Sequence, residues 1–271
     1  MHVRLNLVVI AAAATMLAIA VAAAAAVKPP PGIASSGRIV FCTDATYPPE
    51  EYFKGSKMVG SDIDIGTGVA KLMRVKAQFK NTTFDSIIPA LLVKKCDAII
   101  AGMNDTAKRR KQVDFVDYLK VGQAITVKKG NPEHFTTLAS LSGHRVSVES
   151  GTTNRDFLAA TSKKLTAQGK PSITIVTFPK DTDAFAALVA GKVDAYFADA
   201  PPAAYYAKRN PTVVQVCCHP VNPIPIGVAI RKHDPLRAAT QKAIRTMYAN
   251  GTMRKIVARW GMTNAVVLLE R

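Results

Sequence analysis

A turn between a predicted strand and a predicted helix carries residues suited to binding a small anion. Gly151, Thr152 and Thr153 follow the apolar strand expected at 145–148 and open a helix expected from about 152 to 167. At such a turn the first backbone N–H groups of the helix are free, and the helix dipole favours negative charge. The sequence therefore predicts an anion-binding turn at this point.

A second set of candidate residues follows another predicted strand. The segment 97–101 is apolar and short, as expected for a buried strand, and Ala101, Gly102 and Asn104 stand at or just beyond its end. In doubly wound α/β sheets, ligands bind where strands end and backbone groups are exposed. We therefore expect these three residues to face a ligand.

Two charged residues could bind the ends of a zwitterion, although each also has a simpler explanation. Asp199 ends a strand expected at 195–198, and it could instead cap the helix that Pro201 opens. Arg109 lies within the basic run Lys108–Lys111, and this position alone indicates a surface cation. The residues by themselves leave both alternatives open.

Motifs of the common catalytic classes are absent from the sequence. It contains no G-x-S-x-G, no P-loop and no H-E-x-x-H. The histidines are scattered, and neither they nor the cysteines have the spacing of metal ligands. We therefore expect no catalytic residue, no metal site and no cofactor.

Residues 1–26 have the features of an export signal. Arg4 supplies a positive charge, residues 5–21 are apolar, and the run Ala22–Ala26 offers small residues for cleavage. A membrane anchor is the alternative, but the apolar stretch is rich in alanine and is followed at once by the charged, proline-rich segment 28–32. We expect cleavage after the alanine run and a soluble periplasmic product.

The net charge is +17, of which Arg4 contributes one unit to the signal segment. Lysine and arginine are spread along the whole chain, and no basic segment is interleaved with aromatic residues. Together with the expected export, this pattern indicates a solvated surface with some long-range attraction for anions, and we expect no nucleic-acid partner. The hydrophobic share of 48% is ample for packed cores, and we expect a monomer.

The four cysteines leave the disulfide pattern open. Cys42 lies late in one predicted strand and Cys96 just before another, so in parallel neighbouring strands they are expected at opposite ends, too far apart for a bridge. Cys217 and Cys218 are adjacent, and a bridge between them would be strained. We expect at least two of the thiols to be buried and unpaired.

The order of predicted elements indicates two α/β units. Apolar strands and periodic helices alternate twice, which favours parallel, doubly wound sheets. Strands are expected at 38–43, 75–79, 97–101, 145–148, 173–178, 195–198, 212–216 and 226–230, and helices ending at 73 and spanning 84–93, 152–167, 184–190 and 235–260.

One lobe is expected to be inserted into the other. A flexible segment at 27–37 would precede the lobes, and a tail at 263–271 would follow them. Lobe 1 would comprise 38–121 plus 226–262, lobe 2 would comprise 125–221, and strands near 119–124 and 222–226 would form the hinge. Such paired lobes commonly close around a ligand.

The segment 60–73, GSDIDIGTGVAKLM, resembles the signature of the family 3 extracellular solute-binding proteins of bacteria. One departure is Ser61, where the family prefers a large side chain, and we expect looser packing there. Further resemblances occur in family order at 43–49, 84–91, 97–102, 106–109, 150–153 and 250–252. The resemblance thus covers nearly the whole chain after the signal, and it implies a type II periplasmic-binding-protein fold with two Rossmann-like lobes and a two-strand hinge.

The resemblance also implies roles for individual residues. Arg109 matches the arginine that binds a ligand α-carboxylate through two parallel hydrogen bonds, and Asp199 matches the acid that pairs with the α-ammonium. Contacts to the ligand side chain are implied for Asp44, Tyr47, Phe84 and Glu149. Two carboxylates there favour a polar or basic amino acid over an acidic one.

The function implied is the binding component of an amino-acid ABC transporter, which would deliver its ligand to a membrane permease. A cyclohexadienyl dehydratase is the alternative on the same fold. Those enzymes tend to carry a glutamate after the Gly-Thr-Asn segment of lobe 2, where this chain has Asn154 and Arg155. A periplasmic sensor is a third reading, for which no signalling segment is recognised after Trp260. We expect a binding protein and not an enzyme.

Overall fold

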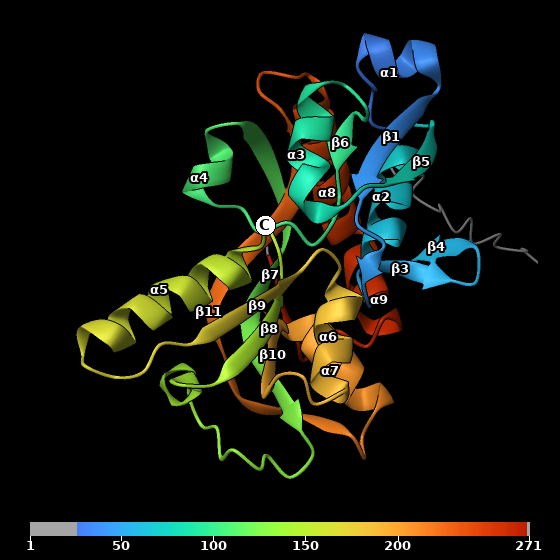
Figure 1. Ribbon diagram of the computed structural model, residues 1–271. Coiled ribbons are helices and arrows are strands. Elements are labelled where there is room, and N and C mark those ends of the chain that lie inside the picture. The colour runs from blue at the N-terminus through green and yellow to red at the C-terminus, as the bar shows by residue number, and fades with distance from the viewer. Residues whose placement is uncertain (1–25, 270–271) are drawn as a thin grey trace, which may run out of the picture.

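The computed structural model describes residues 26–269, an α/β protein with two lobes (Figure 1). The expected signal at 1–26 lies almost wholly outside the described residues. The helices of the protein are α1 Pro31–Ser36, α2 Ser61–Leu72, α3 Phe84–Leu92, α4 Ala107–Arg110, α5 Thr153–Ala167, α6 Asp181–Val189, α7 Ala200–Arg209, α8 Leu236–Ala249 and α9 Thr252–Arg259, with a 3₁₀ turn at Leu138–Leu141. No helix in the described part is long and apolar enough to span a membrane.

Nine strands form one continuous sheet. Its order is β5-β1-β6-β11-β7-β10-β8-β9, and β12 pairs with β7. These strands are β1 Arg38–Thr43, β5 Lys76–Asn81, β6 Ala98–Ile99, β7 Val113–Lys128, β8 Arg145–Glu149, β9 Thr174–Phe178, β10 Ala195–Asp199, β11 Val214–Arg231 and β12 Val266–Leu268. A smaller sheet contains β2 Thr46–Tyr47, β3 Glu51–Lys54 and β4 Lys57–Val59.

Parallel strands lie at both ends of the large sheet and antiparallel strands in its middle. β1 is parallel to β5 and β6, and β8 is parallel to β9 and β10. Between these two groups, β7 and β11 run antiparallel to each other. This arrangement confirms the predicted fold class, two doubly wound lobes joined by two strands. Figure 1 shows α2, α3 and α8 around the first group and α5, α6 and α7 around the second.

The two connecting strands are longer than the sequence indicates. We expected separate strands at 212–216 and 226–230, whereas β11 runs without interruption from Val214 to Arg231. Prolines 220, 223 and 225 favour a break, because proline cannot donate to a ladder. Here they are accommodated by register shifts between β11 and β7 on either side of Val221 and after Ile226.

Separate hydrophobic cores support each lobe. One core joins buried residues between Val27 and Val121 to those between Ile226 and Met262, and others draw only on residues between Ile125 and Cys217. The apolar side chains of the two segments that flank lobe 2 therefore pack together in one core. The proposed boundaries at 121, 125, 221 and 226 stay a prediction.

Both ends of the described chain pack against lobe 1. The segment 27–37 was expected to be flexible, but Val27 and Ile33 are buried and Pro31 opens α1. Its Val27 N–H also donates to the Leu72 carbonyl at 2.8 Å. The tail beyond 263 contains β12, which pairs with β7 near the hinge. Apolar side chains in both segments account for this docking.

Cys42 and Cys96 form a disulfide with Cα atoms 5.7 Å apart, so the expectation that they lie too far apart is wrong. The strand β6 has only two residues, and its register sets Ile99 beside Cys42. The turn before it folds back along β1, where the Asp97 N–H donates to the Val40 carbonyl at 2.8 Å. This turn brings Cys96 within bridging distance of Cys42. Cys217 and Cys218 are unbridged, as expected, but only Cys217 is buried and Cys218 is half-buried, so the expectation of two buried thiols is met by Cys217 alone.

Replacing Cys42 and Cys96 together by alanine should lower the free energy of unfolding by about 2–4 kcal/mol. The bridge joins residues 54 positions apart and so restricts the unfolded chain. Urea unfolding followed by circular dichroism measures the loss. The control is Cys218→Ala, which removes an unbridged thiol and should cost less; an equal loss in both proteins would contradict a contribution from the bridge.

Candidate functional site

A small cavity lies between the two lobes. It is about 10 Å³ in volume, which is room for about one water molecule and far less than an amino acid needs. A ligand as large as an amino acid can therefore enter only if the two lobes separate. The lining residues are Asp44, Tyr47, Phe84, Ala101, Gly102, Asn104, Glu149, Thr152, Asn154 and Asp199.

Nine of the twelve predicted site residues line this cavity, and they converge because the parallel strands of both lobes end there. Asp44 follows β1, Ala101 and Gly102 follow β6, and Glu149 and Asp199 end β8 and β10. The carboxyl ends of parallel strands meet at one edge of a sheet, so residues distant in sequence come together. The other three, Arg109, Gly151 and Thr153, contact residues at the rim.

Arg109 is a buried cation that reaches across the cleft. It is 8% exposed, and its guanidinium donates to the Asn104 carbonyl at 2.8 Å and to the Gly151 carbonyl in lobe 2 at 3.2 Å. The guanidinium carbon also lies 5.2 Å from the centre of the Phe84 ring. Burial lowers the pKa of Arg109 to about 10, which leaves it charged at neutral pH. The interpretation as a surface cation is therefore wrong.

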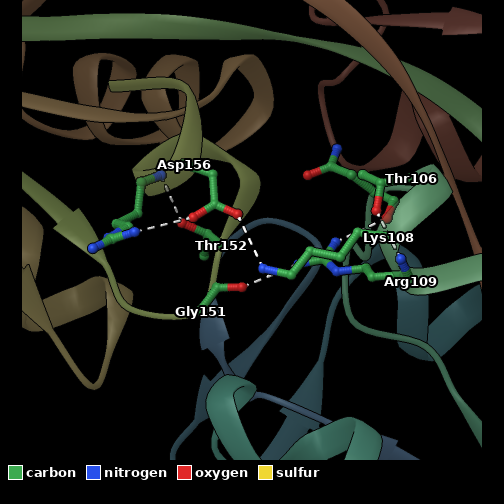
Figure 2. Close-up of polar contacts among 8 residues, drawn as sticks. Thr106, Lys108, Arg109, Gly151, Thr152 and Asp156 are labelled. Carbon is green, nitrogen blue, oxygen red and sulfur yellow. Dashed lines mark hydrogen bonds and ion pairs between the residues drawn. The ribbon is translucent and has the colours of Figure 1, made fainter. Parts of the chain in front are cut away.

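The short helix α4 separates Arg109 from its basic neighbours. Thr106 caps this helix by accepting a hydrogen bond from the Arg109 N–H at 3.1 Å. Figure 2 shows the Arg109 side chain directed at Gly151, while Lys108 pairs with Asp156 at 3.6 Å in an exposed contact. Arg110 pairs with Asp105. Of the run Lys108–Lys111, only Arg109 is buried.

Asp199 faces the same centre from lobe 2. Its carboxylate accepts from the side-chain amides of Asn104 at 3.4 Å and Asn154 at 3.2 Å, and its backbone N–H donates to the Tyr47 hydroxyl at 3.1 Å. It stands at the N-cap position of α7, but its side chain makes no capping bond. Burial raises the pKa of Asp199 to about 7, against the opposing effects of Asn104 and Arg109.

Asn104 connects Arg109 with Asp199. Its carbonyl accepts from Arg109 and its side-chain amide donates to Asp199, so both charged groups contact one residue. Within residues 26–269, Arg109 has no carboxylate oxygen within 4.0 Å. A ligand carrying one carboxylate and one ammonium group would supply a counter-charge to each.

Asn154 and Gln123 belong to the site but were not predicted. Gln123 donates to the Asn154 side-chain oxygen at 2.6 Å, and Asn154 in turn donates to Asp199. Thr153 donates to the Asn104 side chain at 2.5 Å, which is a further contact between the lobes. Asn154 could have been found from its place next to Thr153. Gln123 gives only a weak signal, a polar residue in an apolar strand.

Asp44 and Glu149 make part of the cavity wall acidic. Asp44 accepts from the Thr46 hydroxyl at 2.8 Å and the Phe84 N–H at 2.7 Å. Glu149 is buried, and its Oε1 has no hydrogen-bond partner among the described residues. The pKa of Glu149 is raised well above its usual value by burial and then by the nearby charges of Asp181 and Asp44. A donor group of a ligand would satisfy this oxygen.

Gly151 allows the lobes to meet. Its φ is +72°, a conformation that favours glycine, and a Cβ at this position would lie 2.1 Å from an Asp85 side-chain oxygen, so a larger residue would strain the backbone and displace Asp85. Next to it, the Ser150 hydroxyl donates to Asp85 across the cleft.

Comparisons with known proteins identify the family of this chain. A sequence model of the bacterial extracellular solute-binding proteins, family 3, matches residues 39–263. The chain belongs to this family.

Two similar proteins are named for the amino acid that they bind. The ABC transporter arginine-binding protein 1 of Escherichia coli K12 is 30% identical over 235 residues, covering 84% of this chain and 93% of the relative. The solved structure of an ancestral arginine-binding protein bound to arginine is 38% identical with a TM-score of 0.77, covering 83% of this chain and 98% of that structure.

A third similar structure bears on the question of catalysis. It is an ancestral amino-acid-binding protein described as a precursor of cyclohexadienyl dehydratase, 35% identical with a TM-score of 0.77, covering 84% of this chain and 97% of that structure. Together with the family match, these comparisons support a periplasmic location and a binding role.

Below its cavity this solute-binding protein contains a cluster of buried acids that was not predicted. Asp62 accepts from the Gly102 N–H at 2.7 Å and the Tyr118 hydroxyl at 2.6 Å, so it holds a cavity residue in place. Burial raises the pKa of Asp62 to about 6. Burial and the charge of Asp62 raise the pKa values of Glu50 and Glu51 well above their usual range. Ser61 is fully buried beside them.

The ligand-free protein should be less stable at pH 8 than at pH 5. A carboxyl whose folded pKa is raised stabilises fully below its unfolded pKa, here 3.8, and this contribution is lost as pH rises through about 6. Asp62 alone should account for about 1–2 kcal/mol between the two pH values. Urea unfolding at both pH values measures this difference.

The variant Asp62→Asn cannot ionise at this position and should show a smaller difference between pH 5 and pH 8. Asp183→Asn, at an exposed position on α6, is the control and should behave as the natural protein does. An unchanged pH dependence in Asp62→Asn would show that Asp62 does not contribute.

Proposed function

We propose that this protein is the periplasmic substrate-binding component of an amino-acid ABC transporter and that it traps a basic amino acid by closure of its lobes. Polar zwitterions would be weaker ligands. The protein would act as a monomer and deliver its ligand to a membrane permease. The observation that carries the proposal is the unequal charge around the cavity.

Three acids and one buried cation surround the cavity. Asp44, Glu149 and Asp199 line it, and Arg109 reaches its rim. The α-carboxylate of an amino acid would pair with Arg109, and its α-ammonium with Asp199. Asp44 and Glu149 are then left without a counter-charge. A cationic ligand side chain would supply one, whereas an acidic side chain would be repelled.

Closure follows from the division of these groups between the lobes. Asp44, Asn104 and Arg109 belong to lobe 1, and Glu149, Thr152 and Asp199 to lobe 2. The ligand would first bind the lobe 1 groups, and closure would add the others and exclude water. The names of the arginine-binding relatives agree with this ligand class.

The natural protein, without residues 1–26, should bind arginine and lysine more tightly than glutamine, and glutamine more tightly than glutamate or aspartate. Arg109→Ala should weaken arginine binding by at least about thirtyfold, because loss of one partner of a buried charge pair costs about 2–5 kcal/mol. Isothermal titration calorimetry measures both effects.

The matched control is Lys108→Ala, at the exposed neighbouring cation, which should bind as the natural protein does. Binding of glutamate and aspartate but not of arginine, lysine, histidine or glutamine would overturn the ligand class. Full affinity in Arg109→Ala would overturn the assigned α-carboxylate site.

Glu149→Gln should separate recognition of the side chain from recognition of the zwitterion. Glutamine cannot take the ionised form that a ligand cation would stabilise, so this change should weaken arginine and lysine binding at least about tenfold, because hydrogen bonds to charged groups contribute about 1.5–3 kcal/mol. Glutamine binding should change little. The exposed Glu133→Gln is the control, and an equal loss for arginine and glutamine would argue against contact with the side chain.

We infer that the protein binds its ligand without catalysing a reaction. At the position where the related dehydratases tend to carry glutamate, Asn154 has its amide engaged with Gln123 and Asp199. Arogenate and prephenate should therefore remain unconsumed when incubated with the protein.

A further inference from the structure

Two adjacent thiols lie on β11 where its pairing with β7 is interrupted. Cys217 lies opposite Ile125, but the next pair is Val221 with Gln123, so β11 contains two extra residues here. Successive side chains of a regular strand point to opposite faces. Cys218 has a φ of +65°, outside the extended range, and this conformation brings both thiols to the same side.

The two thiols are in contact, with Cys218 donating a hydrogen bond to Cys217. Cys217 Sγ and Cys218 Sγ are 2.8 Å apart, compared with about 2.05 Å in a disulfide. Cys217 is 6% exposed and packs in the lobe 2 core, and burial raises the pKa of its thiol. Cys218 is half-buried and therefore the more accessible of the two.

We propose that Cys217 and Cys218 form a redox-active dithiol that closes reversibly into a disulfide between neighbouring residues. The reaction partner is a disulfide-bearing oxidant, either a small disulfide such as oxidised glutathione or a dithiol oxidoreductase. The site is separate from the ligand cavity and does not depend on the function proposed above.

The exchange proceeds in two displacements. The Cys218 thiolate attacks one sulfur of the oxidant, forms a mixed disulfide and releases one thiolate. The Cys217 thiolate then attacks the Cys218 sulfur and releases the second. The two cysteines lose two electrons and two protons in total; the oxidant gains the electrons, and its two thiolates take up protons.

The resulting bond is easily reduced in comparison with the other bridge. Adjacent Cα atoms are held about 3.8 Å apart by the peptide unit, below the usual range of about 4.4–6.8 Å for disulfides. The Cα atoms of Cys42 and Cys96 lie within that range at 5.7 Å. Strained disulfides are the labile ones.

Glutathione buffers test the proposal on the natural protein without residues 1–26. Samples are equilibrated at stepped ratios of reduced to oxidised glutathione, quenched with N-ethylmaleimide, and analysed by intact mass and peptide mapping. With oxidised glutathione in excess, neither Cys217 nor Cys218 should be alkylated. Both should become alkylated together as the reduced form increases, at ratios where the Cys42–Cys96 bridge stays intact.

Three results would overturn the proposal. Both thiols could remain alkylatable at every ratio, a stable glutathione adduct could accumulate at Cys218, or the protein could form a disulfide-linked dimer. Reduction of the Cys217–Cys218 bond and the Cys42–Cys96 bridge at the same glutathione ratio would contradict the proposal that the Cys217–Cys218 bond is the more easily reduced.

Single variants test the order of attack, with circular dichroism to verify folding. Cys217→Ser should accumulate a glutathione adduct at Cys218, because the second displacement is missing. Cys218→Ser leaves only the buried thiol and should be modified much more slowly. Faster modification of Cys218→Ser than of Cys217→Ser would overturn the assigned order, and the titration of the natural protein does not depend on either variant.

Discussion

The structure depends on the burial of many carboxylates around a single buried cation at the junction of two lobes. Among the described residues, Arg109 is the only buried lysine or arginine. The buried acids are Asp44, Glu50, Glu51, Asp62, Asp105, Glu149, Asp181 and Asp199. An isolated buried charge is costly, so such groups are either protonated or supplied with donors.

Donors come from tyrosines and from backbone N–H groups beside the cavity. Tyr118 donates to Asp62, and Tyr196 and Tyr206 donate to Asp181. Backbone N–H groups of Phe84 and Gly102 donate to Asp44 and Asp62. These hydrogen bonds fix the cavity walls, because Asp44 and Asp62 hold the backbone of Phe84 and Gly102, two residues that line the cavity.

The general architecture could be predicted from the sequence because it rests on local patterns. Apolar strands alternate with periodic helices, and the carboxyl ends of parallel strands indicate where ligand contacts gather. The signal for Arg109 came only from its family resemblance, since the basic run around it indicates a surface. The helix α4 turns this one side chain inward, and that rotation cannot be read from composition.

Features set by register and by long-range packing could not be predicted. The bridge between Cys42 and Cys96 depends on β6 being only two residues long. Glu50 and Glu51 follow two prolines and suggest an exposed loop, yet both are buried in the structure. The sheet β2–β3–β4 was missed because its strands have two to four residues and carry charges. The prolines of β11 indicated that the strand would be interrupted, whereas shifts in its register with β7 keep it continuous.

The core of lobe 1 is assembled from both ends of the chain, and this has a consequence for folding during synthesis. Residues 27–121 emerge from the ribosome first, but their core also needs Ile226, Ile244 and Met253. Lobe 2 draws its cores from one uninterrupted stretch and can be completed earlier. The first lobe to be translated can therefore complete its core only after the last part of the chain has been made.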